Sequence, residues 1–141
     1  MTKKPVARVS ASAAKRPSTT TPVAPKGITW RFAKLDHDGP WPLHSLSGDE
    51  HKQVLLTLGG LETSTFDELA SKRGNKYIPV VSLCNLAQKR LEALKLDDQD
   101  GLWEMHVTGK QRAWGFRTGN IMSLLWWDPS HEVCPSTKKN T

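Results

Sequence analysis

Residues 102–127 have the sequence LWEMHVTGKQRAWGFRTGNIMSLLWW, and this stretch decides the fold. Apolar and polar residues alternate over much of it with the period of two that is typical of a β-strand, and Gly109 and Gly119 interrupt it where tight turns belong. The pattern predicts antiparallel strands over residues 102–108, 111–118 and 121–127, with a short last strand over 132–134. Because residues 121–127 are almost all apolar, we expect their strand to be central and covered on both faces.

A two-residue turn at Gly109-Lys110 would fix how the first two of these strands pair. It sets Val107 opposite Arg112, Met105 opposite Trp114 and Trp103 opposite Phe116, which predicts one aromatic face that belongs to the core. The other face then forms a shallow polar groove over the small residues Ala113 and Gly115. The polar side chains expected on that groove are Glu104, His106, Gln111 and Arg117.

The preceding part of the chain predicts one strand and two to three helices. Residues 28–35 alternate as a half-buried strand does, and residues 36–42 hold the Asp, Gly and Pro residues of a turn. Two capping boxes, Ser47 with Glu50 and Thr65 with Glu68, start a helix that ends or loosens near Gly59-Gly60 and a shorter helix through residue 71. The buried face of the first helix is expected to hold Val54, Leu55, Leu58 and Leu61.

A third helix is expected to begin after Ser82 as its N-cap, because apolar residues recur behind it at helical spacing. These residues are Leu83, Leu86, Ala87, Leu91 and Leu94. The segment before this helix, residues 72–76 with the sequence KRGNK, is a basic exposed loop that either contacts phosphate or is simply solvated. The order of elements predicts a single α+β domain over residues 27–141.

The positive charge of the chain is concentrated near the N-terminus. Residues 1–26 hold six of the 20 Lys and Arg residues and no acid, so the rest of the chain carries 14 basic and 14 acidic residues. This Ser/Thr/Ala/Pro-rich segment is expected to be a disordered basic arm. Its composition also fits an organellar transit peptide, but the segment lacks the amphipathic helical period of such peptides. Because the domain itself is neutral, the positive charge of the whole chain is no evidence for a nucleic-acid-binding fold.

The sequence favours a soluble, cytoplasmic protein that uses neither a membrane nor a small-molecule cofactor. No apolar run approaches the roughly 18 residues that cross a bilayer, and the two cysteines suit a reduced interior better than a disulfide scaffold. Asp36, His37 and Asp38 are interpreted as turn-capping residues. His131 and Cys134 make at most half of a zinc site, so no metal is expected.

Three segments resemble the RelE/ParE superfamily of bacterial toxins. They are residues 87–91 (AQKRL), 102–107 (LWEMHV) and 111–116 (QRAWGF), with the apolar strand that follows; residues 126–136 (WWDPSHEVCPS) are similar to a set of small bacterial proteins with the same layout. The resemblance covers about residues 80–135. It implies a RelE-like fold, and a toxin that acts on mRNA or the ribosome and is held by an antitoxin protein.

The resemblance also implies site residues. Many members of the superfamily cleave mRNA by attack of a ribose 2′-hydroxyl on the adjacent phosphate, which needs a base, an acid and cations. Arg112 falls on a phosphate-contacting arginine of the family, His106 near its basic strand position and His131 near a C-terminal Tyr or His position, so these three are the catalytic candidates. The candidates for binding substrate are Glu104, Arg117, Lys138 and Lys139.

Two other functions stay open at this point. The expected strand register puts Arg112 and His106 on opposite faces, which departs from a converging catalytic site. The main alternative is a non-catalytic protein-interaction module that keeps the fold and binds a protein partner through the Trp-rich sheet and the terminal tails. A third interpretation is a general nucleic-acid binder that works through residues 1–26, whose binding would fall steeply with salt.

Overall fold

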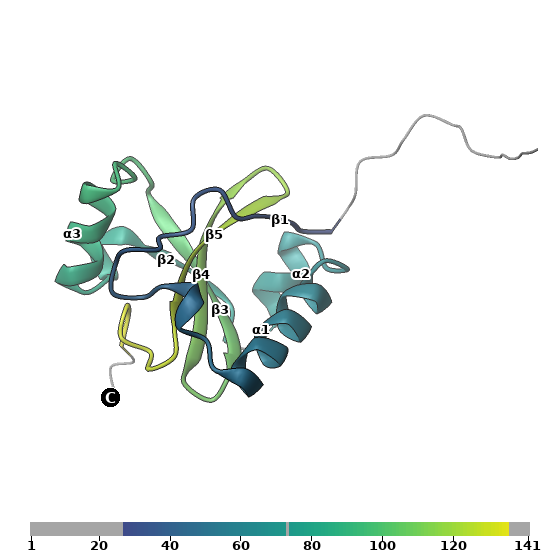
Figure 1. Ribbon diagram of the computed structural model, residues 1–141. Helices are drawn as coiled ribbons and strands as arrows, with labels where there is room; N and C mark the ends of the chain where they lie inside the picture. The colour runs from purple at the N-terminus through teal and green to yellow at the C-terminus, as the bar shows by residue number, and fades with distance from the viewer. Residues whose placement is uncertain (1–26, 73, 136–141) are drawn as a thin grey trace, which may run out of the picture.

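A five-stranded mixed sheet organises the protein. The computed structural model describes residues 27–72 and 74–135, and the sheet runs through the middle of them (Figure 1). Its strands lie in the order β1-β5-β4-β3-β2. They are β1 (Thr29–Arg31), β2 (Lys76–Pro79), β3 (Gly101–Thr108), β4 (Gln111–Thr118) and β5 (Ile121–Asp128). The three long strands confirm the predicted meander, and the class is α+β.

Helices cover both faces of the sheet. The helices α1 (Gly48–Leu61) and α2 (Phe66–Ser71) lie on one side, and α3 (Asn85–Ala93) lies on the other (Figure 1). Trp103, Met105 and Trp127 pack toward α1 and α2, whereas Trp114 and Trp126 pack toward α3. The expectation of one aromatic face and one polar groove is therefore wrong, because each face carries its own apolar core.

A β-bulge explains this difference. The two-residue turn is present, with Thr108 paired to Gln111 and Gly109 at φ +54°. The register then shifts between His106 and Thr108, so that His106 pairs with Arg112. One extra residue in a strand reverses the faces of everything beyond it. Consequently, Glu104 pairs with Trp114, and Met105 pairs with Ala113.

The edges of the sheet differ from the prediction in three ways. The first strand is limited to Thr29–Arg31 and runs parallel to β5, so the sheet is mixed. The short strand β2, which the sequence did not indicate, pairs with β3 and closes the other edge. Residues 132–134 form no strand, because the backbone there bonds to the side chain of Asp128 instead of to a sheet edge.

The helix starts follow the capping boxes, and the third helix does not start where predicted. Ser47 and Thr65 cap α1 and α2, and α1 ends at Leu61, just beyond the two glycines. The N-cap of α3 is Cys84, since residues 80–82 form a 3-10 turn that includes Ser82. Leu55 and Leu86 are 68% and 56% exposed, so their predicted places in the core are wrong.

Several expectations concern residues outside the described part of the chain. The disordered arm at residues 1–26 and the candidate residues Lys138 and Lys139 belong to this group. Among the described residues, no helix is long and apolar enough to cross a membrane.

An ion pair between a buried carboxylate and a partly exposed arginine ties the loop after β1 to α3. The carboxylate of Asp36 accepts hydrogen bonds from Arg90 Nε at 2.8 Å and Nη2 at 2.7 Å, and from Trp126 Nε1 at 2.9 Å. Burial alone would raise the pKa of Asp36, but the hydrogen bonds from Arg90 and Trp126 outweigh it and hold the pKa below its ordinary value of 3.8. The turn that the sequence predicted at residues 36–42 is thus anchored to the sheet and to a helix.

Replacing Arg90 by Ala should lower the free energy of unfolding by about 3 kcal/mol, because it leaves the buried carboxylate of Asp36 without its charge partner. Urea denaturation of the full chain measures this change. The control is Lys89→Ala, which removes the same charge from an exposed position of α3 and should change stability by less than about 0.5 kcal/mol. Equal effects of the two variants would contradict the anchoring role of Arg90.

Candidate functional site

A buried carboxylate, Glu104, is the centre of the candidate site. Glu104 lies in the middle of β3 and is only 2% exposed, on the face of the sheet that packs toward α3. Its cross-strand neighbours are Trp114 on β4 and Lys76 on β2. A carboxylate in such a place needs charged or hydrogen-bonding partners, since an isolated buried charge is strongly unfavourable.

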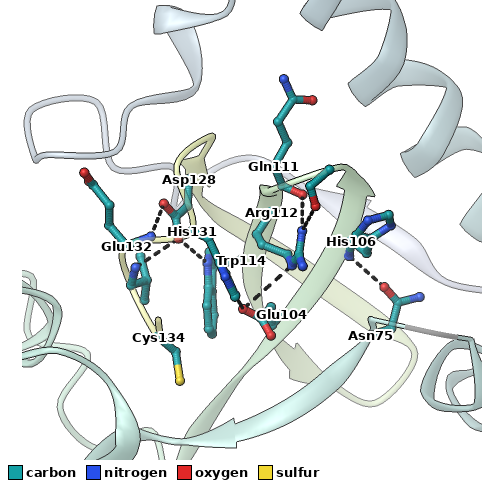
Figure 2. Close-up of polar contacts among 12 residues, drawn as sticks. Asn75, Glu104, His106, Gln111, Arg112, Trp114, Asp128, His131, Glu132 and Cys134 are labelled. Atoms are coloured by element: carbon teal, nitrogen blue, oxygen red, sulfur yellow. Dashed lines mark hydrogen bonds and ion pairs between the residues drawn. The ribbon is translucent and has the colours of Figure 1, made fainter. Parts of the chain in front are cut away.

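His131 is the first partner of this carboxylate. Its Nε2 lies 2.9 Å from Glu104 Oε2, within hydrogen-bond distance, and the histidine side chain is 15% exposed (Figure 2). The backbone of His131 has φ +58°, in the left-handed region that few residues other than glycine adopt. Because Nε2 of His131 is bonded to Glu104, Nδ1 is the ring nitrogen that can exchange a proton with a ligand.

Asp128, the last residue of β5, shapes the turn that carries His131. Its carboxylate is fully buried and accepts hydrogen bonds from Trp114 Nε1 at 3.2 Å and from the backbone N–H groups of Glu132 at 2.8 Å and Val133 at 3.0 Å. These bonds fold residues 128–133 back over the end of the sheet (Figure 2). The left-handed backbone of His131 lies inside this turn, so Asp128 determines where the imidazole points.

Arg112 is the second partner. Its Nε lies 4.0 Å from Glu104 Oε2, at the limit of an ion pair, and its Nη1 donates to the carbonyl oxygens of Gly109 at 2.7 Å and Gln111 at 3.1 Å. The Nε atom is buried and makes no hydrogen bond. The guanidinium is therefore held beside the carboxylate by the β3–β4 turn.

Two of these side chains, Glu104 and His131, border a hollow of about 410 Å³, here called the Glu104 pocket. Its lining combines polar groups with a small apolar wall. The lining residues are Lys76, Ile78, Ser82, Glu104, His131, Cys134 and Pro135. The strand β2 borders the pocket on one side, and the segment that follows β5 borders it on the other.

Burial sets the proton affinities of two groups in this pocket. Desolvation raises the pKa of Glu104 above its ordinary value of 4.5, although the nearby charges of His131, Arg112 and Lys76 pull it down. Burial also raises the pKa of the Cys134 thiol above 9.0, with the carboxylate of Glu104 as a further cause. Cys134 therefore stays protonated near neutral pH and is a poor nucleophile.

The structure brings together only part of the candidate set. Arg112 and His131 both lie beside the carboxylate of Glu104. His106 pairs with Arg112 in the sheet, but its side chain lines another hollow together with Lys72 and Asn75. Arg117 lies apart from this cluster, with its guanidinium stacked 3.9 Å over the ring of Phe66 and its Nε bonded to the carbonyl of Gly119.

Sequence reasoning missed two residues of the site. Lys76 was assigned to a loop, and only the pairing of β2 with β3 places it opposite Glu104. The sequence pattern gave Asp128 no role. An acidic residue at the end of an almost wholly apolar strand was the available signal, since its carboxylate needs hydrogen-bond donors when it is buried.

Comparison of the chain with protein-family models, curated protein sequences and solved structures gives no match. Function is therefore inferred from the site. A histidine held by a buried carboxylate, with a guanidinium and an ammonium beside it, can transfer protons and bind an anion in one place. Among the described residues, no group of His, Cys, Asp and Glu side chains has the arrangement of a metal site.

Asp128→Ala should lower the free energy of unfolding by about 3 kcal/mol, because the Trp114 indole and two backbone N–H groups lose their acceptor. Amide hydrogen exchange of Glu132 and Val133 should accelerate well beyond the global change. Ser130→Ala, at an exposed position of the same turn, should alter neither quantity. Unchanged protection of the two amides in Asp128→Ala would refute the role given to Asp128.

Stability should depend on pH through Glu104. The pKa of Glu104 is raised in the folded chain, so the folded state binds the proton of this carboxyl group more tightly than the unfolded state does. The protonated carboxyl group therefore stabilises the fold below pH 4.5, and this stabilisation is lost as the pH rises through the raised pKa. The Glu104→Gln variant has no such loss. Its free energy of unfolding relative to the wild type should therefore increase between pH 4.5 and pH 7, as measured by urea denaturation. A pH-independent difference would contradict this, and Glu92→Gln on the exposed side of α3 controls for loss of a carboxylate.

Proposed function

We propose that this protein cleaves RNA by attack of a ribose 2′-hydroxyl on the adjacent phosphodiester. The observation that carries the proposal is the contact of one buried carboxylate, Glu104, with both His131 and Arg112 beside a pocket that Lys76 also lines. This set supplies the proton-transfer group and the cations that such a reaction needs.

Each side chain has a distinct role in this proposal. His131 accepts the proton of the 2′-hydroxyl at Nδ1, while Glu104 holds the ring by Nε2 and stabilises the imidazolium that forms. Arg112 and Lys76 bind the non-bridging oxygens of the phosphate, where charge increases in the transition state. Glu104 is only 3% exposed in its side chain, so it acts through His131.

The reaction balances without any other reactant. The O2′–P bond forms and the P–O5′ bond breaks, which gives a 2′,3′-cyclic phosphate and a free 5′-hydroxyl. The proton that leaves O2′ goes to His131, and the imidazolium returns a proton to the departing O5′. The substrate class is single-stranded RNA, because this attack requires a flexible ribose–phosphate linkage that can bring O2′ in line with P–O5′.

We further propose that the activity is that of a toxin similar to the RelE/ParE superfamily. The helix α3, which holds residues 87–91, and the meander β3–β5 lie within the resemblance over residues 80–135 and support this proposal. The strand and two helices before them match in layout only, and β1, which runs parallel to β5, and β2 are additional features. Such a toxin acts on mRNA or the ribosome in the cytoplasm and has an antitoxin protein as its partner.

A second candidate function, a protein-interaction module, is favoured by one surface feature. Phe32 and Leu55 are 54% and 68% exposed and border an apolar groove of about 310 Å³ between α1 and the loop after β1. Exposed apolar patches of this kind mark contacts with other proteins. This function requires no chemistry at Glu104, so the two candidates differ in what the site variants do.

His131→Ala and Arg112→Ala should each reduce RNA cleavage by at least about 100-fold, because the first removes the proton acceptor and the second removes charge from the transition state. The assay incubates the purified full chain with a DNA oligonucleotide that holds a single ribonucleotide. The product should carry a 2′,3′-cyclic phosphate, identified by mass spectrometry. Expression of the wild type should also arrest bacterial growth.

The matched control for this assay is Arg117→Ala, which removes an arginine on the same strand, β4, outside the pocket. It should cleave at the wild-type rate, and the soluble yield of every variant should be recorded beside its activity. No cleavage by a well-folded wild type, with no growth arrest, would overturn the proposal and leave the interaction module.

A further inference from the structure

A polar hollow lies on the face of the sheet opposite the Glu104 pocket. It has a volume of about 480 Å³, and it is here called the Tyr77 pocket. Tyr77 pairs with Trp103, which packs on the side of α1 and α2, and directly paired residues point to the same face of a sheet. The hollow is therefore separate from the candidate reaction site. Its lining consists of Tyr77, residues 98–101, Trp103 and Arg117.

The aromatic wall of this pocket is fixed by the start of β3. A Cβ atom at Gly101 would lie 2.6 Å from Cζ of Tyr77, so only glycine lets the tyrosine ring lie this close to the strand. The ring also meets the indole of Trp103 edge-on, with 5.8 Å between the ring centroids. Tyr77 is still 47% exposed. An exposed aromatic ring in a fixed position can bind a cation, and arginine most often.

The charges of the pocket favour a cation. Asp98 and Asp100 both line it, and within the described part of the chain neither carboxylate forms an ion pair. Their loop is held to the sheet, because the carbonyl of Asp100 accepts a hydrogen bond from the backbone N–H of Val80 at 3.0 Å. The guanidinium of Arg117 also belongs to the lining, but it is stacked on an aromatic ring and bonded to the carbonyl of Gly119. The two carboxylates therefore leave the lining with an excess of negative charge.

The described chain begins close to this pocket. The carbonyl of Gly27 accepts a hydrogen bond from Asn120 Nδ2 at 3.3 Å, in the turn between β4 and β5. Asn120 follows Gly119, the residue whose carbonyl accepts from Arg117. The stretch from Arg117 to Asn120 spans at most about 10 Å. The N-terminal segment therefore joins the fold near the wall of the pocket that Arg117 forms.

The N-terminal segment supplies the complementary charge. Residues 1–26 hold six Lys and Arg residues and no acid. Two of them, Lys15 and Arg16, are adjacent and match the two carboxylates of the pocket in number. The stretch from Arg16 to Gly27 spans about 36 Å when extended and about 18 Å as a flexible coil, so the pair can reach the pocket. Residues 3–4 are a second basic pair, but their longer tether gives a lower effective concentration.

We propose that the Tyr77 pocket binds the side chains of Lys15 and Arg16 of the same chain. The guanidinium of Arg16 stacks on the Tyr77 ring, and the two cations pair with the two carboxylates. Exposed ion pairs are weak, and the tether compensates for this weakness. The contact keeps these cations away from polyanions, which compete for them. This inference is independent of RNA cleavage, since it uses no residue of the candidate reaction site.

Trypsin cleavage of the Lys15–Arg16 bond in the folded full chain tests the contact. The initial rate at low salt is measured by mass spectrometry of the peptide that ends at Lys15. The double variant Asp98→Asn with Asp100→Asn should increase this rate about threefold, because proteolysis depends on the fraction of the segment that is not bound. The matched control Asp97→Asn lies in the same loop but outside the lining, and it should leave the rate unchanged.

Three results would overturn the inference. Equal rates for the wild type and the double variant at low salt would show that the pocket does not hold the segment. Acceleration by Asp97→Asn as large as by Asp98→Asn alone would show a general attraction to the acidic loop. A wild-type rate that falls as the protein concentration rises would assign the segment to the pocket of a second molecule.

Discussion

The β-bulge between His106 and Thr108 is the constraint on which the candidate site depends. A regular hairpin from the Gly109-Lys110 turn would pair Val107 with Arg112 and leave Arg112 on the face opposite Glu104. The extra residue moves Arg112 and Trp114 to the face of Glu104 and pairs His106 with Arg112. The same shift places Trp114 in the core beside α3 while Trp103 lies in the core beside α1 and α2, so the bulge affects both how the sheet is covered and which charges meet.

Asp128 is the second residue that positions the site, because it links Trp114 to the turn that carries His131. The bulge places Trp114 on the α3 side of the sheet, where its indole N–H reaches the buried carboxylate of Asp128. The other bonds of Asp128 fold the following turn, which brings His131 to Glu104. A residue at the end of one strand therefore positions a histidine over another strand, and the site is as rigid as the sheet that supports it. Preorganisation of this kind is what makes polar groups effective in catalysis.

Much of the fold was predictable from local signals. Gly109 and Gly119 marked the turns of the meander, and the capping boxes at Ser47 and Thr65 marked two helix starts. The errors concern features that local pattern does not encode. A single inserted residue at Val107 has no signature in the alternation, the pairing of β2 depends on a distant strand, and Leu55 and Leu86 have helical spacing without a surface to cover them. Of the site, His131, Arg112 and Glu104 were candidates from the sequence, whereas the contact of the first two with the carboxylate of Glu104 depends on the strand register and on Asp128.

The central claim is that Glu104, His131 and Arg112 form one site for a phosphate group on RNA. The most direct measurement is an NMR titration of the ¹⁵N-labelled full chain with uridine 3′-monophosphate. We expect the Arg112 Nε–H and the His131 ring signals to shift together and to saturate at the same ligand concentration, while the Arg117 Nε–H signal stays in place. Shifts at Arg117 alone, or no saturable shift at Arg112 and His131, would contradict the account.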